Sequence, residues 1–154
     1  MRDSELKKRT KQFALRTIRM VESLPRSVGA DVLGRQVLRS ACSVAANYRS
    51  ACRAKSRPDF VSKMGTVEEE ADESGLWFEL LGESGIIAPR KVAALLKEAD
   101  ELTAIVVASI RTARARSSGN ESAIRNPKSA IKSSAIRNPQ SAMGKSAFRK
   151  PHSA

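Results

Sequence analysis

Histidine and cysteine, which supply many catalytic bases, nucleophiles and metal ligands, are scarce in this sequence. His152 is the single histidine, and Cys42 and Cys52 are the two cysteines. The chain also has no Gly-rich phosphate loop, no Cys-x-x-Cys pair and no histidine placed to join a serine and an acid in a catalytic set. Without a base, an activated nucleophile or a metal cradle, we expect a protein that is not an enzyme and uses no cofactor and no metal.

Long apolar runs are also missing. Nothing approaches the ~18 consecutive apolar residues of a membrane-spanning helix, and no charged start followed by an apolar stretch marks a secretory signal. We therefore expect a cytoplasmic protein. Cys42 and Cys52 are ten residues apart in one predicted helix, or ~15 Å along its axis. A disulfide needs Cα atoms within about 7 Å, so we expect both cysteines to stay reduced.

What the sequence does contain favours helices. Apolar residues make up 41% of the 154 residues, aromatic residues only 4%, and Ala, Leu and Val dominate the apolar set. The fold class that we predict is all-α, an antiparallel up-down-up-down four-helix bundle. It occupies residues 1–116, and residues 117–154 form a disordered basic tail.

Local signals divide residues 1–116 into four predicted helices. The first covers residues 4–24 and ends before Pro25, and the second covers residues 31–55. Ser56-Arg57-Pro58-Asp59 gives the third a capping hydroxyl, an early proline and an acid three residues on, and Gly85 is its stop. The fourth opens at Pro89. Because the connections are short, we expect neighbouring helices to run antiparallel.

Apolar residues recur along each predicted helix at spacings of three and four, which is the period of a buried helical stripe. The stripes are Phe13, Thr17, Met20 and Leu24 in the first helix; Leu33, Val37, Ala41, Val44 and Tyr48 in the second; Phe60, Met64, Val67, Ala71, Ser74, Phe78 and Leu81 in the third; and Val92, Leu95, Ala99, Leu102, Val106, Ser109 and Ala113 in the fourth.

The net charge of +12 is unevenly distributed. Residues 1–57 carry +10, residues 58–110 carry −7, residues 111–116 add +3 and residues 117–154 add +6. The basic half could bind phosphate backbones. Alternatively, basic and acidic surfaces of neighbouring copies could pair on assembly, or the charges could be ordinary solvated helix faces.

One face of the second predicted helix is rich in arginine. Arg35, Arg39, Arg49 and Arg53 fall within an arc of about 80° opposite the apolar stripe. The acidic cluster of the third helix, with Asp72, Glu73 and Glu79, raises the alternative of a di-iron site. That site type requires Glu-x-x-His spacing on facing helices, and no histidine is available, so we expect no metal there.

The tail from Ser117 onward contains a twelve-residue repeat, in which Ser122–Pro127 recurs as Ser134–Pro139. Each unit has few large apolar residues and is interrupted by Asn-Pro or Gly, so it cannot form a core. The tail could add non-specific affinity for nucleic acid, or it could be a translated tandem repeat without a specific role.

Three stretches carry a resemblance to a known family: residues 39–49, residues 51–60 and residues 69–77. They resemble the bacterial "four helix bundle protein" family, and the resemblance covers about residues 5–116. That family includes proteins encoded in intervening sequences of large-subunit ribosomal RNA genes and is related to the accessory protein of diversity-generating retroelements. Many ribosomal-type relatives have Asn-Ile-x-Glu-Gly where this chain has Asn47-Tyr48-Arg49-Ser50-Ala51. This departure places the chain in a different branch.

The resemblance implies an antiparallel four-helix bundle and, because related proteins form ring-like pentamers with basic surfaces, a homo-oligomer. The retroelement relative binds nucleic acid and a reverse transcriptase. Two hypotheses follow. In the first, the chain binds nucleic acid, most simply RNA, as an accessory of a nucleoprotein complex, through Arg35, Arg39, Arg49, Arg53, Lys55 and Arg57 with help from the first helix. In the second, the chain is a self-assembly or protein-interaction module, with Tyr48 or Trp77 buried between subunits.

Overall fold

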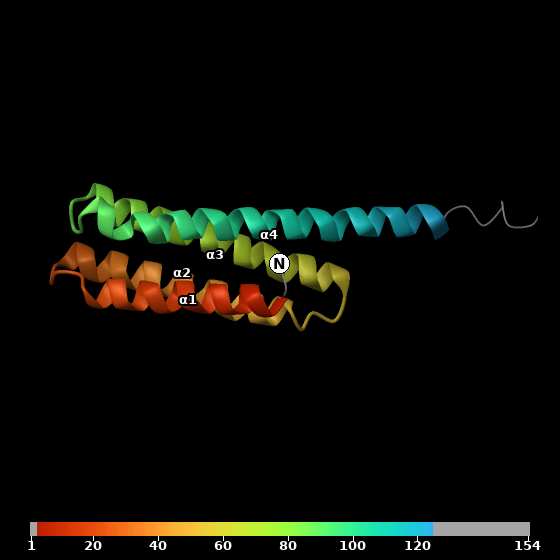
Figure 1. Ribbon diagram of the computed structural model, residues 1–154, viewed down its shortest axis with the longest axis horizontal. Coiled ribbons are helices and arrows are strands. Elements are labelled where there is room, and N and C mark those ends of the chain that lie inside the picture. The colour runs from red at the N-terminus through yellow and green to blue at the C-terminus, as the bar shows by residue number, and fades with distance from the viewer. Residues whose placement is uncertain (1–2, 125–154) are drawn as a thin grey trace, which may run out of the picture.

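A computed structural model describes residues 3–124, which form four α-helices and no strand. The helices lie side by side along one long axis, and successive helices run in opposite directions (Figure 1). The predicted all-α, up-down-up-down bundle is therefore confirmed. Residues 125–154, which hold most of the predicted repeat tail and His152, lie outside the described residues.

The first two helices start and stop close to the predicted positions. Helix α1 is Asp3–Glu22, and it ends just before the Leu24-Pro25 turn. Helix α2 is Val28–Ala51, so it begins three residues earlier and ends four residues earlier than predicted. The early start has a local cause, because the Ser27 hydroxyl accepts a hydrogen bond from the Ala30 amide at 3.1 Å and caps the helix.

Helix α3, Arg57–Glu83, confirms the strongest start signal in the sequence. The Ser56 side chain accepts a hydrogen bond from the Asp59 amide at 3.2 Å. The Asp59 carboxylate reaches one residue further back than a standard capping box and accepts from the Lys55 amide at 2.9 Å. At the other end Gly85 has a φ of +75°, a conformation that glycine adopts without strain, and the chain turns there.

Helix α4 is Pro89–Ile124, which makes it the longest helix of the described residues. At 1.5 Å per residue, its 36 residues span ~54 Å, against ~30 Å for the 20 residues of α1. It therefore projects beyond the other three helices at one end (Figure 1). The helical backbone continues eight residues past the predicted boundary at residue 116.

The predicted apolar stripes form the core. The largest fully buried side chains are Phe13, Met64, Phe78, Leu81 and Leu102. Phe13 of α1 and Phe78 of α3 meet edge to face across the bundle, with ring centroids 6.1 Å apart. Ser109 and Ala113, predicted to lie in the stripe of α4, are only half-buried, whereas Ile110 is buried.

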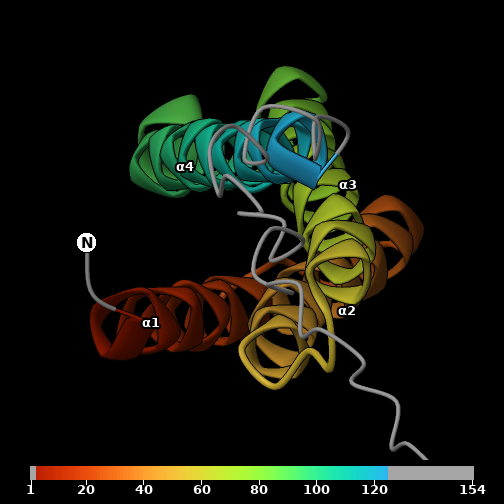
Figure 2. The same ribbon diagram turned by 90° about the vertical axis from the view of Figure 1, so that its right-hand side faces the viewer.

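The four helices do not pack equally tightly. Helix α3 packs along both α2 and α4, whereas α1 packs mainly on α2 and meets α4 over a much smaller contact. Viewed along the bundle, α1 and α4 are spread apart while α2 and α3 lie together (Figure 2). Polar contacts join the spread helices. Arg9 Nε of α1 donates to Glu98 Oε1 of α4 at 2.6 Å, and Arg16 Nη2 donates to the Ala94 carbonyl at 3.3 Å.

Candidate nucleic-acid interface

All six basic residues predicted to bind nucleic acid are exposed in the structure. The two nearer the start of α2 are already paired with acids of the same chain. Arg35 Nη2 donates to Asp31 Oδ2 at 2.7 Å, one turn earlier in the helix. Arg39 Nη2 donates to Glu73 Oε1 of α3 at 2.6 Å. Since these carboxylates offset the positive charge locally, Arg35 and Arg39 attract a phosphate less strongly than an unpaired arginine does.

The remaining four lie at the end of α2, in the turn that follows it and at the start of α3. They are Arg49, Arg53, Lys55 and Arg57, and their side chains form no ion pair within the described residues. Arg49 lies in the last turn of α2, and Arg53 follows two residues after the helix ends at Ala51. This part of the predicted site keeps its charge free for a partner.

The topology adds basic residues from elsewhere in the chain to these four. In an antiparallel bundle, the start of α1, the end of α2, the start of α3 and the end of α4 lie at the same end (Figure 1). We call this the basic end, residues 4–11, 49–63 and 111–115. It holds eleven Lys and Arg against two Asp and Glu. The corresponding opposite end, residues 18–35 and 79–93, holds five against four, so one end is strongly positive and the other is nearly neutral.

Two of the eleven cations have acidic partners. Arg9 pairs with Glu98 and Glu101 of α4, and its hydrogen bond to Glu98 is the main reason why the pKa of Arg9 is raised. Lys63 pairs with Asp59, and this hydrogen bond, with the one from the Lys55 amide, lowers the pKa of the Asp59 carboxyl. The nine others form no ion pair within the described residues. They are Lys7, Lys8, Lys11, Arg49, Arg53, Lys55, Arg57, Arg111 and Arg114.

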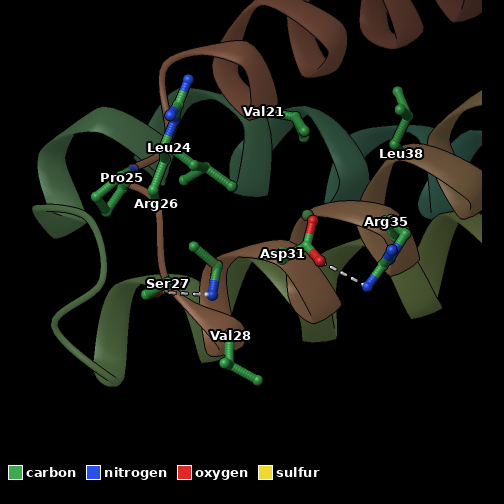
Figure 3. Close-up of a pocket in the computed structure, with 11 residues that line it drawn as sticks. Val21, Leu24, Pro25, Arg26, Ser27, Val28, Asp31, Arg35 and Leu38 are labelled. Atoms are coloured by element: carbon green, nitrogen blue, oxygen red, sulfur yellow. Dashed lines mark hydrogen bonds and ion pairs between the residues drawn. The ribbon is translucent and has the colours of Figure 1, made fainter.

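The basic end is also hollowed. An open groove of about 720 Å³ lies between the start of α1, the end of α2, the start of α3 and the later part of α4. Leu6, Phe60, Met64 and Ile105 supply large apolar lining, and Arg57 stands among the lining residues. A second groove, of about 490 Å³, lies at the opposite end around the turn from α1 to α2. Figure 3 shows its wall of Val21, Leu24 and Leu38 and the Arg35–Asp31 pair beside it.

The comparisons with known proteins agree with this architecture. The family model described as 23S rRNA-intervening sequence protein matches residues 2–108. The chain belongs to the 23S rRNA-intervening sequence protein family. A solved structure of a protein with unknown function from the S23 ribosomal protein family, from Bacteroides thetaiotaomicron VPI-5482, is 30% identical, with a TM-score of 0.67. The match covers 72% of this chain and 99% of the other. No curated protein matches the chain.

In this member of the intervening-sequence family, the two predicted subunit-contact residues are differently placed. Tyr48 is 4% exposed and belongs to the core of its own bundle, so it has little surface to offer a neighbouring subunit. Trp77 is half-buried on α3, and its indole Nε1 donates to Glu73 Oε1 at 3.0 Å. A contact between subunits through either residue stays a prediction.

The outer face of α3 combines acids with exposed leucines. Leu76 is 48% exposed and Leu80 is 38% exposed. At 100° per residue they share an arc of about 100° with four exposed acids. These acids are Glu69, Asp72, Glu79 and Glu83. On α2, Val28 and Val32 are exposed near Arg35. We call these surfaces the acidic leucine face and the valine face, and both expose apolar side chains.

Among residues 3–124, no group of three or more His, Cys, Asp or Glu side chains is arranged to hold a metal ion. None of the helices in this range is long and apolar enough to cross a membrane. Both cysteines are free, Cys42 exposed and Cys52 half-buried.

Proposed function

We propose that this protein is a non-enzymatic helical bundle that binds RNA through the basic end. The observation that carries the proposal is the gathering, from four separate helices, of nine cationic side chains without acidic partners among the described residues. Fixed positive charge at this density attracts phosphates and releases the counterions condensed on them. The family name, which refers to a ribosomal RNA intervening sequence, supports RNA as the nucleic acid.

Within the basic end, we assign most of the phosphate contacts to Arg49, Arg53, Lys55 and Arg57. We expect Lys7, Lys8 and Lys11 of α1 to add further contacts. Arg35 and Arg39, which are paired with Asp31 and Glu73, contribute at the margin. Contacts to phosphates carry little sequence information. We therefore expect binding that tolerates many sequences and depends strongly on salt. The cytoplasmic location predicted from the sequence is compatible with this role and stays a prediction.

The test is a salt titration of RNA affinity with the full-length protein and a fluorescent single-stranded RNA. If four phosphates are neutralised, log K against log salt has a slope of about −2.8, so that affinity falls about 50-fold from 50 to 200 mM salt. A slope near zero, or no binding at 50 mM salt, would contradict the proposal.

A second candidate function is self-assembly, because the acidic leucine face and the valine face expose apolar side chains at separate places on one chain. When two such surfaces lie apart on a molecule, each copy can bind the next, and the series closes into a ring if the rotation allows. The pentamer implied by the family resemblance would be one such ring. We expect L76Q/L80Q to convert the assembly to monomers in light scattering at micromolar concentration. A wild-type monomer under these conditions would exclude this function.

A further inference from the structure

The groove at the basic end has an apolar interior that the bundle leaves open to solvent. Its α4 wall contains small side chains, Ala108, Ser109 and Ala113, and Ala54 adds another from the turn before α3. Because no large side chain of the described residues fills the space, about 720 Å³ remains accessible. That volume lies within the 300–1,000 Å³ typical of small-molecule pockets, so it is large enough for a planar ring system.

One aromatic side chain is available at the surface of this groove. Phe60, in the first turn of α3, lines it and is only half-buried, whereas Tyr48, the other aromatic residue of the lining, is 4% exposed. A partly exposed aromatic ring beside an apolar cavity is the usual platform on which proteins stack an unpaired base.

The charges around the groove favour a polyanion as its occupant. Arg57 lines the groove, and Arg53 and Lys55 belong to the turn that carries it. No side chain of these three forms an ion pair within residues 3–124. None of the lining residues is acidic. The occupant therefore needs an apolar, planar part for the groove and negative charge for the rim.

We propose that the groove receives an unstacked base of single-stranded RNA against Phe60, while Arg53, Lys55 and Arg57 hold the flanking phosphates. This inference rests on the proposed RNA binding and adds a substrate class to it. A duplex keeps its bases stacked and paired and can use only the charged rim. A single strand, a loop or a bulge can use both the rim and the groove.

The first experiment compares a 12-nucleotide single strand with a duplex of the same sequence, at equal salt, using the full-length protein. We expect the single strand to bind on the order of tenfold more tightly, because base–aromatic stacking adds to the phosphate contacts. Phe60→Leu removes the ring and Ala108→Leu fills the groove, both without changing charge. Each variant should lose the preference for the single strand and keep its affinity for the duplex.

A matched control for Ala108→Leu lies on the same helix, α4. Ala93 is exposed near the start of α4 and is not part of the groove lining, so Ala93→Leu should leave the preference unchanged. Equal binding of single strand and duplex by the wild type would overturn the inference and leave the proposed function standing. If neither RNA bound at low salt, the proposed function would fail, and the inference with it.

The two cysteines give a second, independent readout. Cys52 lines the groove, and Cys42 is exposed on the same helix outside the lining. We expect single-stranded RNA to slow the alkylation of Cys52 by iodoacetamide and to leave Cys42 labelled at its free rate. Unchanged labelling of Cys52 at saturating RNA would overturn the inference. Protection that rises with protein concentration and needs no RNA would overturn it too, by assigning the groove to a contact between copies.

Discussion

Arg39 of α2 and Glu73 of α3 form a hydrogen-bonded ion pair at 2.6 Å, and the same Glu73 oxygen accepts a hydrogen bond from the Trp77 indole at 3.0 Å. A second acid, Glu70, lies 4.0 Å from the Arg39 guanidinium. Part of the charge complementarity between the basic first half and the acidic second half of the chain is therefore satisfied within one bundle. Arg39 and Arg35 are thus paired with acids of the same chain, whereas Arg49 and Arg53 are not.

Because the Arg39 side chain is 57% exposed, we expect its pairing to add little stability. Arg39→Gln should lower the free energy of unfolding by less than about 1 kcal/mol, with a smaller loss at high salt, as for other exposed ion pairs. Urea titrations followed by Trp77 fluorescence at two salt concentrations measure this. A loss in the free energy of unfolding above about 2 kcal/mol would contradict this expectation. It would show that the ion pairs of Arg39 stabilise the packing of α2 on α3 more than exposed ion pairs usually do.

The edge-to-face pair of Phe13 and Phe78 connects α1 to α3 across the core, and both rings are fully buried. Phe78→Ala should lower the free energy of unfolding by about 3–5 kcal/mol, which is typical of a buried phenylalanine. Leu80→Ala is the control on the same helix. Since Leu80 is 38% exposed, its loss should cost less than about 1 kcal/mol. Chemical denaturation of both variants tests this, and equal losses would contradict the core assignment.

Two helical glycines test the close approach of α1 and α2. A Cβ at Gly65 of α3 would meet nothing within 4 Å, so Gly65→Ala should stabilise the protein by about 0.5–1 kcal/mol through helix propensity. A Cβ at Gly34 of α2 would lie 3.1 Å from Leu24 and 3.3 Å from Val21. We expect Gly34→Ala to lose most of that gain. The melting temperatures of both variants test this difference. An equal rise in melting temperature for Gly65→Ala and Gly34→Ala would show that α1 is free to move outward.

Asp59 gives a prediction for pH. Its hydrogen bonds to Lys63 and to the Lys55 amide lower its pKa in the folded protein below that of the unfolded chain. The contribution of the ionised Asp59 carboxylate to folding stability is therefore complete above the unfolded-state pKa, near pH 4. This stability is lost as the pH falls through the lower folded-state pKa. The difference in melting temperature between the wild type and Asp59→Asn should shrink from pH 6 to pH 3. A constant difference would contradict this role.

The helical periodicity was sufficient to predict the fold. The stripe from Met64 to Leu81 is buried as predicted, and the cap at Ser56 begins α3. Boundaries were less accurate where a short-range signal was overlooked, as at Ser27, whose hydroxyl caps α2 and starts it three residues early. The partner of Arg39 was not predictable in the same way, because it depends on how α2 and α3 align. The Asp31–Arg35 pair has i,i+4 spacing in one helix and could have been predicted.

The contribution of the first helix was predicted from the sequence, but the gathering of cations from all four helices at one end was not. In the sequence, Lys7 and Arg111 lie near opposite ends of the segment that forms the bundle. Folding brings the segments that carry them to the same end. The signal was present in the predicted topology, because an up-down-up-down bundle places the start of the first helix beside the end of the fourth. Summing charge by end, and not by sequence position, would have found this surface.

The most direct test of RNA binding at the basic end compares two double variants with the same change in charge. Arg49→Gln with Arg53→Gln removes two unpaired cations, whereas Arg35→Gln with Arg39→Gln removes two that are paired with acids. The measurement is the affinity for single-stranded RNA from 50 to 200 mM salt. The first pair should weaken binding strongly and reduce the magnitude of the salt slope by about 1.4, and the second pair should change both only slightly. Equal effects of the two pairs, or a larger effect of the second, would contradict the placement of the RNA site at the basic end.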